Sequence, residues 1–326
     1  MTVYTTYFDK NYLDRGLALI SSVREFDKES RIFVLAFDET AAKEVGDRFP
    51  DVKILSEQDL IDFEPRLSET KKVRSRIEQY FTQTPILMRR VLEETTIGEV
   101  CVYLDADLYF FKTPVLVVQE MNDHSVGIIA HKFSRKMDQR LSKFGKYNVG
   151  WVGIRNDRSG QDCIKWWGES CLKWCFDKAE DGKFADQGYL NEFPNRFNAV
   201  KVLENPGFNL APWNVGNYRL SLKDSILHVD ELHPLVFYHF HGLSRGFGRY
   251  FTGEITYRTR LNKELKRFAY QKYIANLEGV VGTFPEALKS GKSSARGKGI
   301  KVHILKVRKS LFRLISFLAG NTIKTK

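Results

Sequence analysis

Cysteine and proline are scarce in this chain of 326 residues, which contains four cysteines and nine prolines. The cysteines form neither a CxxC pair nor a zinc-like spacing, so we expect free thiols and no structural zinc. No apolar run approaches the roughly 20 residues that span a membrane, and the amino-terminal residues lack the basic start of a signal peptide. These absences predict a cytoplasmic protein.

Acidic residues are absent from residues 291–326, which contain ten lysines and arginines. The whole chain has 51 lysines and arginines against 40 aspartates and glutamates, a net charge of +11, so residues 1–290 carry only +1. A basic body would favour nucleic acid, whereas a basic tail favours an anionic surface. We therefore expect no nucleic-acid partner.

The basic tail has two parts. Residues 290–299 are rich in glycine, serine and lysine, which is typical of a flexible linker. Residues 300–318 repeat apolar side chains at steps of three and four, which predicts an amphipathic helix. Such a helix behind a linker is typical of an anchor at a membrane surface, here the cytoplasmic face. The alternative is a helix that packs on the domain with its cations in solvent.

Strand and helix patterns alternate through residues 1–290. This alternation predicts an α/β fold with a mostly parallel sheet and helices on both faces. Strands are predicted at 3–8, 31–37, 52–55, 101–104, 125–131 and 149–154, and helices at 14–26, 39–48, 76–94 and 161–176. The chain lacks both the GxGxxG of dinucleotide-binding folds and the GxxxxGKS/T of P-loop enzymes.

Two carboxylates, Asp105 and Asp107, interrupt a near-continuous apolar run over residues 100–111. That run predicts a strand buried on both faces, and ligands of open α/β sheets bind at such strand ends. Burying carboxylates without a partner is costly, and Mg²⁺ and Mn²⁺ favour oxygen ligands. We therefore expect a metal site at this position. The alternative is a turn in which the two acids cap the next element.

Two further strand ends carry polar groups. The end of the first strand carries Tyr7, Asp9, Asn11 and Tyr12, whose aromatic rings could stack on a ring of a ligand. Alternatively, Asp9 could cap the following helix. Asn148 stands at the head of an apolar strand, where an amide can approach a sugar.

Two later segments complete the set of candidates. Asp186 and Gln187 open a predicted helix, and Asp186 could serve only as its cap. His239 and His241 end a buried strand just before Gly242, and paired histidines at a strand end are more typical of a site than of a core.

The order of these segments resembles that in the retaining glycosyltransferases of the GT-A fold, family 8 and its relatives. The shared motifs are Asp9-Lys10-Asn11-Tyr12, Tyr103-Leu104-Asp105-Ala106-Asp107, Asn148-Val149-Gly150, Asp186-Gln187-Gly188-Tyr189-Leu190-Asn191 and His239-Phe240-His241-Gly242. They extend over about residues 1–245.

The resemblance implies a role for each motif. Asp105, Asp107 and His239 would hold Mn²⁺ or Mg²⁺ against the diphosphate of a nucleotide-sugar, with a UDP-sugar as the favoured donor; the choice between His239 and His241 stays open. The base and ribose would bind at Tyr7, Asp9, Asn11 and Tyr12. The donor sugar and its transfer would involve Asn148, Asp186 and Gln187. The implied acceptor is a cell-surface glycan or a lipid-linked saccharide.

Two family features are absent. The helix before the Asp-x-Asp strand lacks the usual Tyr-x-Arg-Leu-like segment, for which Arg76 is a possible substitute, and no Lys-Pro-Trp follows the histidine motif. Lys132 and Arg245 are candidates for sharing the phosphate charge. Two other functions stay open on the residues alone: a nucleotidyl- or phosphotransferase that uses the paired acids, and a glycan-binding protein with a degenerate site.

Overall fold

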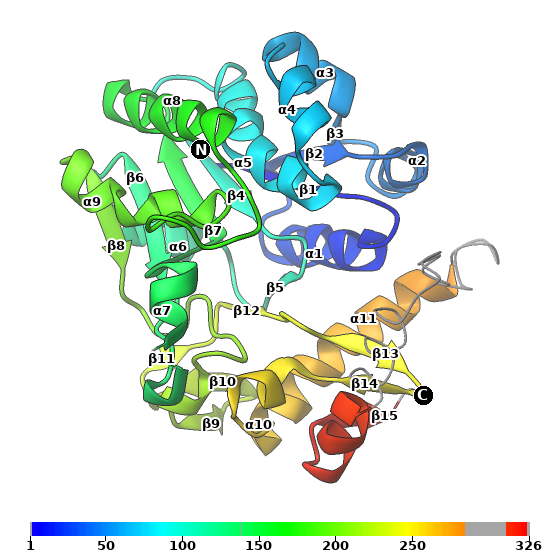
Figure 1. Cartoon of the computed structure of the whole chain (residues 1–326). Helices are drawn as coiled ribbons and strands as arrows, with labels where there is room; N and C mark the ends of the chain where they lie inside the picture. Colours follow the sequence, from blue (N-terminus) through cyan, green and yellow to red (C-terminus); the bar gives the residue numbers. More distant parts are fainter. Residues whose placement is uncertain (1, 138, 284–310, 325–326) are drawn as a thin grey trace.

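A seven-stranded sheet forms the centre of the computed structural model, which describes residues 2–137, 139–283 and 311–324 (Figure 1). Its strand order is β3-β2-β1-β4-β7-β6-β8. The strands are β1 (Thr2–Phe8), β2 (Arg31–Ala36), β3 (Lys53–Ser56), β4 (Val100–Leu104), β6 (Val126–Ala130), β7 (Tyr147–Arg155) and β8 (Val200–Leu203). Within this sheet only β7 runs against the other strands, so the predicted mostly parallel sheet is confirmed.

Helices cover both faces of the sheet, as the alternating pattern predicts (Figure 1). Successive strand residues point to opposite faces, so Val3 packs in one apolar layer and Tyr4 in the other. The helices of the first layer include α3 (Glu57–Phe63), α4 (Leu67–Val73), α5 (Arg76–Leu92), α8 (Arg158–Lys173) and α9 (Phe193–Arg196). Those of the second include α1 (Leu13–Phe26), α2 (Glu39–Arg48) and α6 (Val115–Glu120). All four cysteines are buried and free.

The predicted strand over residues 100–111 is divided in two. β4 ends at Leu104, a turn carries Asp105 and Asp107, and β5 (Leu108–Phe110) leaves the sheet to pair with β12 (Phe237–His239). The acids therefore occupy the turn at which the chain passes from the large sheet into a second, smaller part of the fold.

This smaller part lies below the sheet in Figure 1 and has its own aromatic core. Its elements are β9 (Leu220–Lys223), β10 (Ile226–Val229), β11 (His233–Pro234), β13 (Ser244–Gly246), β14 (Arg249–Phe251), α10 (Lys263–Leu265), α11 (Gln271–Gly282) and β15 (Thr322–Lys324). Of these, β14 pairs with β15, so the end of the basic tail is hydrogen-bonded to residues of the main body.

Most of the predicted tail helix and its linker lie outside the described residues. Residues 311–318 are helical, and the buried side of this helix carries Ser316. Its apolar side faces outward, with Leu311, Leu314, Ile315, Phe317 and Leu318 all exposed. A helix packed by an apolar stripe would show the opposite arrangement. Within the described part of the chain, no helix has both the length and the apolar character needed to cross a membrane.

Candidate active site

The turn between β4 and β5 brings the two acids together with a histidine from far along the chain. Pairing of β5 with β12 sets His239 opposite Leu108, the residue after Asp107. The His239 Nε2 atom lies 3.0 Å from a carboxylate oxygen of Asp107 and 3.7 Å from one of Asp105. The backbone N–H of Phe240 donates to the Asp107 carbonyl at 2.9 Å, which fixes the register beside the acids.

His241 also reaches this cluster. Ligand atoms of Asp107, His239 and His241 all lie within 4.8 Å of one another. The Nδ1 atom of the buried His239 has no hydrogen-bond partner among the described residues. Carboxylate oxygens and imidazole nitrogens suit Mn²⁺ and tolerate Mg²⁺, so this donor set fits the metal implied by the resemblance.

Glycine at position 150 allows the close approach of β7 to the cluster. A Cβ atom there would lie 2.8 Å from His239 ring atoms and 2.6 Å from the Asn148 side-chain oxygen. The Gly150 carbonyl also accepts a hydrogen bond of 3.0 Å from the Asp105 backbone N–H. The strand therefore supports the acid turn directly.

The three titratable groups of this cluster, Asp105, Asp107 and His239, change one another's pKa values. Burial raises the pKa of Asp105, against the opposing charge of His239. Burial also acts to raise the pKa of Asp107, but the charge and hydrogen bond of His239 outweigh it and hold that pKa well below its usual range. For His239, burial lowers the pKa while Asp107 raises it, and the net direction is upward. The cluster thus favours a positive charge between the two acids, a place that a divalent cation can take.

The residues after β1 form a second group at the adjacent strand end. The Asp9 carboxylate accepts hydrogen bonds from the Asn11 backbone and side-chain amides, both at 2.9 Å, and from the Tyr80 hydroxyl at 3.1 Å. The residue at the N-cap of α1 is Tyr12, so Asp9 does not cap that helix. Tyr7 packs between the rings of Phe37 and Tyr103. These contacts hold a carboxylate and several rings at the edge where a base and ribose would bind.

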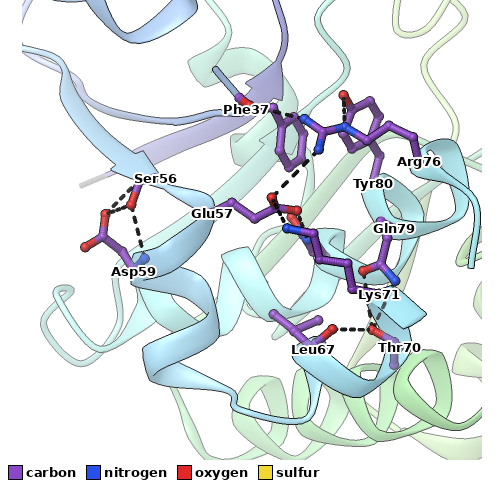
Figure 2. Close-up of polar contacts among 11 residues, drawn as sticks. Phe37, Ser56, Glu57, Asp59, Leu67, Thr70, Lys71, Arg76, Gln79 and Tyr80 are labelled. Carbon is purple, nitrogen blue, oxygen red and sulfur yellow. Dashed lines mark hydrogen bonds and ion pairs between the residues drawn. The ribbon is translucent and has the colours of Figure 1, made fainter. Parts of the chain in front are cut away.

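Arg76 lies beside this second group of residues. Its guanidinium donates to the Tyr80 hydroxyl at 2.8 Å and to the Phe37 carbonyl at 3.1 Å, while the Phe37 and Tyr80 rings stack 4.0 Å apart (Figure 2). Glu57 lies 3.8 Å from Arg76 and accepts from Lys71 at 2.8 Å. Arg76 therefore holds the stacked rings of Phe37 and Tyr80 in place beside Asp9.

Three amides gather at the head of β7. The Asn148 side-chain N–H donates to the Gln187 oxygen at 3.1 Å, and the Asn148 oxygen accepts from Asn209 at 3.1 Å. Gln187 in turn donates to the Phe144 carbonyl at 2.7 Å. The structure thus brings together Asn148 and Gln187, which the sequence proposes separately. The sequence did not single out Asn209 for this group.

Asp186 lies in the same region, with only 3% of its surface exposed. Its side chain makes no capping hydrogen bond to the 3-10 helix at Gln187–Asn191, so it is not merely a helix cap. Burial raises the pKa of Asp186 to about 7, and the charge of Asp105 adds to the rise. Its backbone carbonyl accepts from the Trp167 indole at 2.9 Å, which anchors the segment on α8.

One cation that acts on the acids was not indicated by sequence patterns. Arg15 on α1 carries its guanidinium 4.7 Å from the centre of the Tyr12 ring and donates to the Leu243 carbonyl at 2.9 Å. Its positive charge helps to lower the pKa of Asp107. By contrast, Lys132 donates to the Glu204 carbonyl, and the exposed Arg245 lies 3.8 Å from Glu278. Neither of these two candidates makes a described contact with the acid cluster.

The order of these groups follows the order of the strands. Asp9 and Asn11 follow β1, Asp105 and Asp107 follow β4, and Asn148 lies at the start of β7. Because β7 is antiparallel, its first residues lie at the edge where the parallel strands end. The fold is therefore of the GT-A class, an α/β sheet with paired acids at its carboxyl edge.

Comparison with solved structures supports this assignment of the fold. The chain superposes on the galactosyltransferase LgtC, solved in complex with donor and acceptor sugar analogs, with a TM-score of 0.56 and 16% identity, covering 89% of this chain and all of LgtC. An active-site mutant of LgtC gives a TM-score of 0.54 at 15% identity over 89% of this chain and all of that one. The GT-A fold implied by the sequence resemblance is confirmed.

No protein-family model matches the chain. It is 32% identical to the uncharacterized protein YfnF of Bacillus subtilis (strain 168), over 74% of this chain and 81% of YfnF. It is also 26% identical to the uncharacterized protein YfnD of the same organism, over 84% of this chain and 88% of YfnD. The chain belongs to the family that includes YfnF.

Proposed function

We propose that this protein is a metal-dependent glycosyltransferase that moves a sugar from a nucleotide-sugar, favouring a UDP-sugar, to a glycan or lipid-linked saccharide. The observation that carries the proposal is the cluster of Asp105, Asp107 and His239 at the edge of a GT-A sheet. Superposition on a galactosyltransferase solved with donor and acceptor sugar analogs supports the same reaction class.

On this proposal the donor lies across the strand ends. Its base and ribose bind beside Tyr7, Asp9, Asn11 and Tyr12, and its diphosphate lies between Arg15 and the acid cluster. Asp105, Asp107 and His239 would hold the metal, with His241 within reach as a further ligand. A bound Mn²⁺ or Mg²⁺ supplies positive charge that offsets the charge developing on the departing nucleoside diphosphate.

The sugar of the donor then reaches the amide group at β7. Asn148 orients Gln187 through their hydrogen bond of 3.1 Å, and the buried carboxyl of Asp186 can accept hydrogen bonds from sugar hydroxyls. Asp186 and Gln187 match the motif of the retaining glycosyltransferases that the sequence resembles. We infer that transfer retains the anomeric configuration.

The test is a donor-hydrolysis screen with UDP-, GDP-, CDP- and ADP-sugars in the presence of Mn²⁺. The wild-type protein should turn over one donor class, and both EDTA and the Asp107→Ala variant should abolish that turnover. Asp123→Ala, which removes an exposed acid outside the site, is the matched control and should retain wild-type rates. Calorimetry with Mn²⁺ measures metal binding directly. Asp107→Ala should lose this binding, whereas Asp123→Ala should retain it. Full turnover in EDTA contradicts the metal role.

We also propose that the protein attaches peripherally to a membrane, at the anionic surface of the membrane's cytoplasmic face. The outward apolar side of helix 311–318 lies beside the hairpin of β13 and β14, whose tip Phe247 is 80% exposed. Arg313 lies 5.2 Å from the Phe247 ring centre, and Arg249 lies 5.1 Å from that of Phe317. Apolar side chains interleaved with cations are typical of interfacial helices. Pairing of β15 with β14 would hold this surface in a fixed position on the enzyme.

A further inference from the structure

The segment 131–147, between β6 and β7, concentrates positive charge at one side of the site. It carries six lysines and arginines, namely Lys132, Arg135, Lys136, Arg140, Lys143 and Lys146, and a single acid, Asp138. Outside the tail, such an excess is unusual for this chain, because residues 1–290 carry a net charge of only +1.

These cations lack carboxylate partners within the described residues. Elsewhere on the body, arginines such as Arg24, Arg31 and Arg66 form ion pairs with nearby acids. In segment 131–147, the Lys132 ammonium donates a hydrogen bond to a backbone carbonyl. The side chains of Arg140, Lys143 and Lys146 make cation–π contacts with aromatic rings of the same segment. Among the described residues, no carboxylate therefore neutralises these charges.

Two contacts tie this segment to the site. Arg140 on α7 (Gln139–Phe144) lies 4.7 Å from the centre of the Tyr257 ring, and Tyr257 packs edge-on against His241. At its other end, α7 presents the Phe144 carbonyl that accepts from Gln187 at 2.7 Å. The cations of α7 therefore flank the residues proposed to handle the donor sugar.

α7 approaches the site on the side beyond the acids. Nucleotide-side residues follow β1 and the acids follow β4, whereas α7 comes just before β7 and lies between the sheet and β11 in Figure 1, with Arg140 beside the Tyr257 ring that packs on His241. A donor that extends from Asp9 past the acid cluster has its sugar beside Gln187, so the next group along this line is the acceptor. Trp213 lies there too, buried against His239 and His241, with an indole N–H that has no partner among the described residues.

We propose that the cations of segment 131–147 form a binding surface for an anionic acceptor, a saccharide that carries phosphate or carboxylate groups near its accepting end. This inference rests on the proposed glycosyl transfer and specifies its acceptor. Clustered arginines and lysines raise the local concentration of an anion and orient it.

The test measures anion binding without donor, so that it succeeds or fails independently of the transfer reaction. Full-length protein is titrated with short-chain polyphosphate, with oligogalacturonate and with a neutral maltooligosaccharide of similar length. Hydrogen–deuterium exchange then reports which peptides are protected. We expect protection of residues 132–146 by one or both anions, and none by the neutral chain. Protection by polyphosphate alone identifies phosphate groups as the ligand, and protection by both identifies anionic groups in general.

The variant Lys136→Ala/Arg140→Ala/Lys143→Ala should weaken anion affinity roughly tenfold and remove the local protection, because each exposed charge contributes modestly. A matched control removes three exposed lysines from elsewhere, Lys28→Ala/Lys165→Ala/Lys223→Ala, and should stay within about twofold of wild type. Equal losses in the two variants would overturn the proposal, as would protection confined to residues 311–324. The second result would assign the anion to the tail surface instead.

Discussion

Replacing Asp186 by asparagine should stabilise the protein at neutral pH and at the same time inactivate it. The Asp186 carboxyl is buried, and its pKa is raised from an ordinary value of 3.8 to about 7. The unfolded chain releases this proton near the lower value, whereas the folded protein holds it up to the higher one. The free energy of unfolding therefore falls as pH rises through this interval, by about 1.4 kcal/mol per pH unit.

Between about pH 5 and about pH 7 this loss amounts to ~3 kcal/mol, and it stays constant above the folded pKa. An asparagine side chain does not titrate, so Asp186→Asn should gain ~3 kcal/mol relative to wild type over the same range. Urea unfolding at a series of pH values measures the difference, and other titrating groups cancel between the two proteins. Asp123→Asn, at an exposed position, should show no such trend. Parallel pH curves for wild type and Asp186→Asn would refute the buried, raised-pKa carboxyl.

Three further predictions concern the reaction and the tail. An α-linked nucleotide-sugar should give an α-linked product, and a β-anomeric coupling constant in the NMR spectrum of that product would exclude retention. Arg15→Ala should weaken binding of the nucleoside diphosphate in calorimetry by roughly ten- to a hundredfold, since charge-assisted contacts to phosphate contribute about 1.5–3 kcal/mol. Arg15→Lys should recover part of this loss, and an unchanged affinity would remove Arg15 from the phosphate site. Leu314→Ser/Phe317→Ser should reduce flotation with anionic vesicles and leave donor hydrolysis intact, and the wild-type attachment should weaken as salt rises; undiminished flotation would place the membrane contact elsewhere.

The sequence predicted the elements whose patterns are long and strong. The alternating strands and helices up to residue 176 were found close to their expected bounds, because each is a periodic apolar segment ended by a turn. The acids at Asp105 and Asp107 were also located correctly at a strand end. Many of the elements that escaped prediction are short, such as β5, β13 and β15, whose few residues carry no distinctive period, although the 12-residue helix α11 was also missed. Such strands depend on their partners in the fold rather than on their own sequence.

The sequence did not predict that β7 runs antiparallel to its neighbours. An apolar strand buried on both faces reads the same in either direction, so its sequence does not indicate that it runs against its neighbours. That direction decides whether Asn148 lies at the carboxyl edge of the sheet or at the opposite edge. The prediction that Asn148 lies at the head of a strand needed no knowledge of that direction, and the structure adds that this head lies at the carboxyl edge.

Arg15 shows what the sequence leaves out at the site itself. As one of two arginines on an amphipathic helix, it has no local feature that separates it from Arg24 further along the same helix. Its place near Asp107 arises because the turn after His239 brings the Leu243 carbonyl within 2.9 Å of its guanidinium. The same turn lacks the lysine that the resemblance leads one to expect. On the proposed donor site, a cation from α1 would therefore take the part that the resemblance assigns to a lysine of the histidine loop. The proposed acceptor surface, by contrast, would draw its cations from a single segment, 131–147, whose backbone also holds Gln187 through the Phe144 carbonyl. Changes to the exposed lysines of this segment, rather than to its backbone, would therefore alter acceptor preference and leave the proposed donor residues in place.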